Sequence, residues 1–126
     1  AVEMHGESYL TRRKQFIEKI CEGFSDPMKV ILFAGDFGKD RKEIQLRFEI
    51  LKSWYRDLLV YKETGETKKL VHQDFAEAVE SMAGGMTPSE ILRALETVEW
   101  AYKALEKNAN KQLTLEAMTF KLSGQA

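Results

Sequence analysis

Residues 40–62 read DRKEIQLRFEILKSWYRDLLVYK, and this stretch decides the fold. At 100° per residue, its apolar side chains fall on two neighbouring stripes of one helix. The first stripe contains Ile44, Phe48, Leu51, Tyr55, Leu58 and Leu59, and the second contains Leu46, Ile50, Trp54 and Tyr61. A helix that is apolar on two sides is normally covered by neighbours on both. The stretch therefore predicts a central helix, about 35 Å long at 1.5 Å per residue.

Helical periodicity continues on both sides of this stretch, and no segment shows the alternation of a strand. Asp26-Pro27, Thr87-Pro88-Ser89-Glu90 and Asn110 are start signals, because their side chains can accept hydrogen bonds from free backbone N–H groups. The apolar run after Pro27 predicts a short helix that is buried nearly all round. We expect the other helices over residues 8–22, 27–34, 72–82, 88–107 and 111–122, with a solvated loop over residues 63–69.

The composition fits one all-α domain of five to six helices. The chain has 126 residues, 44% of them hydrophobic and 31% charged, with a net charge of −1. This length suits a single core, and the near-neutral balance disfavours both a disordered chain and a uniformly basic nucleic-acid binder. We expect a frayed lead over residues 1–7, a compact domain over residues 8–122 and a tail over residues 123–126. One cysteine excludes an internal disulfide framework and is compatible with a reducing cytoplasm.

The sequence contains no recognisable catalytic, cofactor-binding or metal site. Residues 35–40 read GDFGKD, but they lack the first glycine and the final Ser or Thr of a phosphate-binding loop. A turn between helices is the expected structure there. His5 and His72 have no metal-binding context and are expected at the surface. Cys21 has no histidine partner in view and is expected to be a buried, inert thiol.

Asp57 is the one carboxylate that falls within an apolar stripe of the central helix. A buried carboxylate needs a partner. Arg47 and Arg56 are near in sequence, so we expect a structural ion pair with one of them. No second carboxylate is placed to act with Asp57 in acid–base catalysis.

Three exposed aromatic or aliphatic side chains are candidate contacts with a partner protein. Trp100 points away from the apolar face of its helix, and tryptophan is enriched at binding hot spots. Leu113 and Phe120 lie on a second flank of the last helix, opposite its core-facing residues. Charge is also divided, with nine basic and six acidic residues over 39–69 and three basic and seven acidic over 70–107. Such polarity fits a protein–protein surface better than a DNA surface, although mutual solvation of the two faces explains it as well.

Residues 54–59, WYRDLL, followed by residues 108–116, NANKQLTLE, resemble the C-terminal domain of the delta-prime subunit of the bacterial DNA polymerase III clamp loader. Lys111 is a departure, because that family often has proline there. The resemblance spans about residues 9–122 and rests on positions whose roles are mainly structural. These positions are Trp54, Arg56, Asp57, Asn108, Asn110, Leu115 and Glu116.

The resemblance implies a collar domain, one of five that pack in a ring and hold the ATPase modules that load the sliding clamp on primed DNA. It implies no catalysis and no cofactor in this domain. The implied partners are the shared gamma/tau-type ATPase subunit and the delta subunit, with DNA and the clamp reached only through the full complex and with no membrane. Two other functions fit the residues: an unrelated helical adaptor, and a small helical enzyme or ligand-binding bundle with carboxylates in a pocket.

Overall fold

The computed structural model describes residues 2–124, with side chains described from residue 9. The described part is helical and contains no strand, which confirms the all-α fold. Its elements are α1 (Val2–Glu22), α2 (Pro27–Gly35), α3 (Arg41–Thr64), the short 3-10 helix η1 (Gln73–Phe75), α4 (Ala76–Gly84), α5 (Pro88–Glu106) and α6 (Lys111–Leu122).

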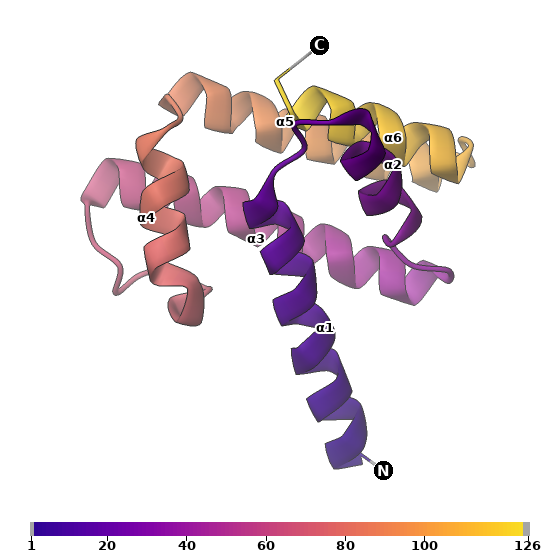
Figure 1. Cartoon of the computed structure of the whole chain (residues 1–126), viewed down its shortest axis with the longest axis horizontal. Coiled ribbons are helices and arrows are strands. Elements are labelled where there is room, and N and C mark those ends of the chain that lie inside the picture. The colour runs from indigo at the N-terminus through magenta and orange to yellow at the C-terminus, as the bar shows by residue number, and fades with distance from the viewer. Residues whose placement is uncertain (1, 125–126) are drawn as a thin grey trace.

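Helix α3 occupies the centre, as its two apolar stripes predicted. Helices α4 and α5 pack against it, α6 lies against α5, and α2 packs on α6 (Figure 1). Helix α1 contacts α3 with its C-terminal half, and its N-terminal half points away from the other helices (Figure 1). The helices therefore form one bundle with a single projecting arm.

Aromatic side chains fill the core from end to end. Trp54 is fully buried, and its indole N–H donates a hydrogen bond to the Met82 sulfur at 3.3 Å. On the α1–α2 side, Phe37 lies between Phe16 and Phe48, with ring centroids 5.5 and 4.9 Å away. Phe37 is the middle residue of the Asp-Phe-Gly triplet, so this triplet is a turn between helices whose phenylalanine anchors the core.

The predicted helix starts are confirmed by their caps. Asp26 accepts a hydrogen bond from the Met28 N–H, and Asn110 accepts one from the Leu113 N–H. Thr87 and Glu90 exchange hydrogen bonds of 2.9 and 3.1 Å in a capping box. Each such cap satisfies backbone N–H groups that the helix itself leaves free.

Several expected boundaries are wrong. Helix α1 begins at Val2 rather than at residue 8, and α3 ends at Thr64, two residues later than expected. The segment expected to be helical from His72 begins with the 3-10 turn of η1, and α4 follows from Ala76.

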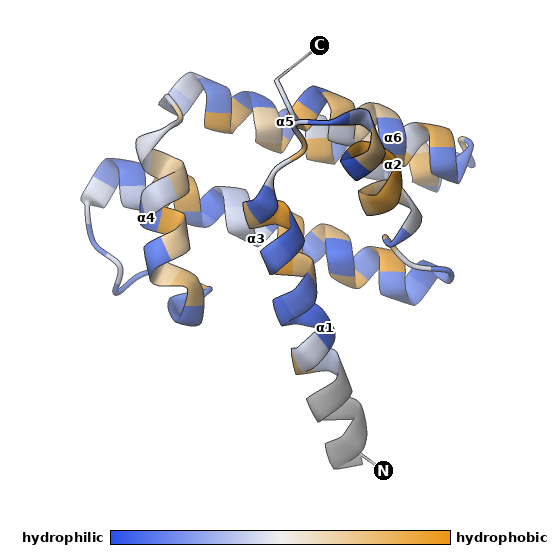
Figure 2. Cartoon of the chain, viewed as in Figure 1, coloured by the Kyte–Doolittle hydropathy of each residue, from blue (hydrophilic) through white to orange (hydrophobic). Residues whose placement is uncertain are grey.

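Several side chains expected in the core are exposed. In α2 only one side packs on the bundle, so Ile31 and Leu32 are 47% and 57% exposed rather than buried all round. Cys21 is exposed, contrary to the expectation of a buried thiol. Leu10 and Leu92 are also exposed. Figure 2 shows that most of α2 has the colour of hydrophobic residues.

Candidate functional site

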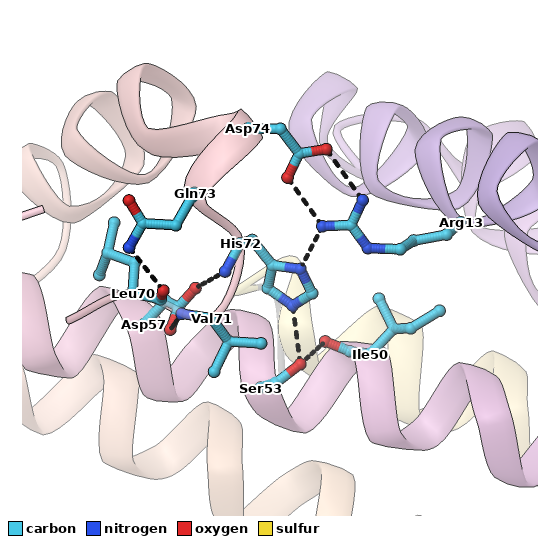
Figure 3. Close-up of polar contacts among 9 residues, drawn as sticks. All are labelled: Arg13, Ile50, Ser53, Asp57, Leu70, Val71, His72, Gln73 and Asp74. Atoms are coloured by element: carbon cyan, nitrogen blue, oxygen red, sulfur yellow. Dashed lines mark hydrogen bonds and ion pairs between the residues drawn. The ribbon is translucent and has the colours of Figure 1, made fainter. Parts of the chain in front are cut away.

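The carboxylate of Asp57 on α3 is buried, with 1% of its surface exposed. Its two oxygens accept hydrogen bonds from the backbone N–H groups of Val71 and His72, at 2.9 and 2.8 Å (Figure 3). The expected ion pair with Arg47 or Arg56 is therefore wrong. Two peptide N–H groups satisfy the carboxylate without a cation, and they fix the loop that enters η1.

His72 is buried rather than at the surface, with 3% of its area exposed. Its Nδ1 lies 2.8 Å from a guanidinium nitrogen of Arg13, and its Nε2 lies 2.7 Å from the Ser53 hydroxyl (Figure 3). A guanidinium can only donate hydrogen bonds, so Nδ1 must accept. The imidazole proton therefore sits on Nε2 and is donated to Ser53, whose hydroxyl is donated to the Ile50 carbonyl at 3.0 Å.

Arg13 carries this network to α1. Its guanidinium donates to both carboxylate oxygens of Asp74 in η1, at 2.9 and 2.8 Å. This hydrogen bond lowers the pKa of Asp74 to about 2 and raises the pKa of Arg13. Burial lowers the pKa of His72, and the positive charge of Arg13 lowers it further, while Asp57 acts in the opposite direction. We refer to Arg13, Ser53, Asp57, His72 and Asp74 as the α1 latch.

The latch is not built to activate a nucleophile, although it contains a serine hydrogen-bonded to a histidine. In a catalytic pair, the histidine nitrogen facing the serine must be free to accept its proton. Here Arg13 occupies the lone pair of Nδ1 and leaves the proton on Nε2, so His72 donates to Ser53 instead. The arrangement joins α1, α3 and η1.

The second feature is an apolar surface formed by α2 and α6. Leu113 and Phe120 are 65% and 43% exposed, and with Ile31 they border a groove of about 360 Å³ between the two helices. Met28 and Leu32 are also exposed on α2, but neither lines this groove, and Leu32 borders a separate hollow between α1 and α2. We call Ile31, Leu113 and Phe120 the α2–α6 face. Large clusters of exposed apolar groups typically mark binding surfaces.

Of the three predicted contact residues, the structure brings two together. Leu113 and Phe120 share the α2–α6 face, whereas Trp100 does not line its groove. Trp100 is 43% exposed on α5, and the ammonium of Lys121 lies 4.1 Å from its ring centroid. This cation–π contact gives Trp100 a partner within the domain.

The other residues of the predicted motifs lie at positions where they serve the fold. Asn108 has a φ of 66°, a left-handed conformation that asparagine tolerates, in the turn between α5 and α6. Leu115 is fully buried, Arg56 is exposed, and Glu116 accepts a hydrogen bond from the Gln112 amide. The side chain of His5 lies outside the described residues.

Within residues 9–124, no cluster of three or more His, Cys, Asp or Glu side chains is arranged to hold a metal ion. None of the described helices combines the length and the apolar character that a membrane span requires.

Comparison with known proteins gives one family. The family model described as DNA polymerase III, delta subunit, C terminal, matches residues 7–123. None of the curated proteins and none of the solved structures matches the chain. The sequence motifs resembled the delta-prime subunit, whereas the matching family is described by the delta subunit. The two agree on a clamp-loader C-terminal domain and differ on the subunit.

The buried carboxylate of Asp57 should be essential to stability. In Asp57→Ala, the N–H groups of Val71 and His72 lose their acceptors, and we expect the free energy of unfolding to fall by about 2–5 kcal/mol. Asp57→Asn keeps one acceptor oxygen and should lose less. Urea denaturation followed by circular dichroism measures both. Equal stability of the Ala variant and the wild type would contradict this role of the carboxylate.

The latch should also make stability depend on pH. The pKa of His72 is lowered in the folded state, so below about pH 6.5 the unfolded chain binds a proton that the folded chain does not. We expect the free energy of unfolding to be constant above that pH and to fall below it, by at most about 1.4 kcal/mol per pH unit. Asp74 contributes a further loss only at more acidic pH, towards its pKa of about 2.

The measurement is urea denaturation between pH 7.5 and pH 5 in a His5→Gln background, in which His72 is the only histidine. Adding His72→Gln should remove the slope, whatever its effect on stability at neutral pH. A slope that persists in this variant would assign the pH dependence to other groups.

Proposed function

Because the chain belongs to the family of C-terminal domains of the DNA polymerase III delta subunit, we propose that it assembles a clamp-loader subunit, delta or delta-prime, with its neighbours. Its role is that of a collar domain in DNA replication. It acts by binding other clamp-loader subunits, among them the shared ATPase subunit, and it reaches DNA and the sliding clamp only through the complete complex. We propose no catalytic step for this domain.

The α2–α6 face carries this proposal. Leu113 is 65% exposed and Ile31 is 47% exposed, although both belong to helices that pack on the bundle. Removing a leucine or phenylalanine side chain from water stabilises a complex by up to about 1.5–3 kcal/mol. Several such side chains on one face therefore supply enough free energy for a specific contact, after the cost of association is met. The family match favours this role over that of an unrelated adaptor.

Trp100 is proposed as a further contact outside this face. The ring of Trp100 on α5 and the ammonium of Lys121 on α6 together form an amphipathic patch. A partner that covers the ring would exclude water from the cation–π pair and strengthen it.

The double variant Leu113→Asp/Phe120→Asp tests the α2–α6 face. We expect it to lose at least tenfold in affinity for a clamp-loader subunit, because two carboxylates replace apolar groups that the contact would bury. Size-exclusion chromatography with light scattering detects the mixed complex, using the shared ATPase subunit and the delta or delta-prime subunit from the same source. Titration calorimetry gives the affinities.

Leu92→Asp is the matched control, since Leu92 is 48% exposed on α5 and outside the α2–α6 face. All these side chains are exposed, so the unfolding temperature should change little. Unchanged binding by the double variant would overturn the assignment of this face. Unchanged binding by Trp100→Ala would remove Trp100 alone from the proposal.

A further inference from the structure

A second groove lies between α1 and α3, with a volume of about 650 Å³. Its apolar floor is formed by Phe16, Leu46 and Ile50, and its rim carries Arg12, Lys42 and Arg47. We call these six residues the cationic groove. None of them belongs to the α2–α6 face, so the groove is a separate surface of the domain.

The cations of the rim are only loosely neutralised by the domain itself. Arg12 and Arg47 share one carboxylate, that of Glu43, at nitrogen–oxygen distances of 3.8 and 4.0 Å. Both distances exceed those of a hydrogen bond. Lys42 is exposed and makes no ion pair with any described side chain. An incoming carboxylate could therefore bind Arg12 or Arg47 more closely than Glu43 does.

The groove is already formed in the isolated domain. Its α1 wall is fixed by Arg13, whose guanidinium is held by Asp74 and His72 of the latch. On the α3 side, the guanidinium of Arg47 lies 5.7 Å from the ring centroid of Phe16, which is 4% exposed. The groove would need little reordering when a partner binds, and this preorganisation favours affinity.

We propose that the cationic groove docks a segment of a second clamp-loader subunit that presents an apolar side chain next to a carboxylate. This inference rests on the proposed function, because a member of a ring needs a surface for each of two neighbours. The apolar floor receives the apolar side chain, and the rim pairs with the carboxylate. A nucleic-acid backbone fits less well, because its row of phosphates would meet the carboxylates of Asp40 and Glu43 repeatedly and offers no apolar side chain to the floor of the groove.

Two charge variants with opposite expected effects test the proposal. Lys42→Glu should weaken binding to one clamp-loader subunit about tenfold, because it repels the incoming carboxylate. Glu43→Gln should tighten binding to the same subunit several-fold, because it removes the carboxylate that competes for Arg12 and Arg47. A gain in affinity cannot arise from misfolding. Lys14→Glu is the control, since Lys14 is exposed on α1 and does not line the groove.

Dissociation constants are measured by titration calorimetry for the shared ATPase subunit and for the delta or delta-prime subunit, at low and at high salt. We expect the affinity of the groove's partner to fall with salt in the wild type and to fall less steeply in Lys42→Glu. If neither charge variant changes any affinity while Leu113→Asp/Phe120→Asp does, the groove proposal is overturned and the proposed function stands. If the wild type binds neither subunit, both are overturned.

A short fluorescein-labelled DNA duplex is the final probe. Binding of this duplex that is lost in Lys42→Glu, with all subunit affinities unchanged, would assign the groove to nucleic acid and overturn the proposal.

Discussion

One buried carboxylate organises the polar contacts between α1 and the rest of the domain. Asp57 accepts hydrogen bonds from the N–H groups of Val71 and His72, and these bonds fix the backbone that leads into η1. Because the backbone of His72 is held there, its ring reaches back to Ser53 on α3 and outward to Arg13 on α1 (Figure 3). Helix α1 is also held by Phe16, Ile17 and Ile20, which are buried in the core, so the latch adds a polar attachment to an apolar one.

The parts of the fold that the sequence predicts are those set by local physics. Two apolar stripes on one helix require neighbours on both sides, and α3 has them. The caps at Asp26, Thr87 and Asn110 each depend on a side chain and a backbone N–H two or three residues away. The partners of Asp57 could not be predicted in this way. They are backbone N–H groups, which every residue except proline has, so no residue type marks them.

Only the α6 part of the α2–α6 face could be predicted from the sequence. The outward position of Leu113 and Phe120 follows from helix geometry once the opposite flank of α6 is in the core. Ile31 was missed because a consecutive apolar run does not show which side of a short helix has a neighbour. His72 shows the same limit for a residue that was predicted at the surface and is buried. Nothing local distinguishes a surface histidine from one buried by Arg13 and Ser53, which are distant in sequence.

The latch and the cationic groove are parts of one structure, and this bears on what α1 does. The groove has one wall on α1 and one on α3, so it exists only while the angle between these helices is held. Arg13 holds that angle together with the buried side chains of Phe16, Ile17 and Ile20, and it also lines the groove. The α2–α6 face includes no residue of α1, α3 or η1 and is independent of the latch. The two proposed surfaces therefore differ in one respect: the α1 wall of the groove is held partly by the hydrogen bonds of the latch, whereas the α2–α6 face does not depend on them. Disturbing the latch would therefore alter the proposed cationic groove while leaving the proposed α2–α6 contact intact.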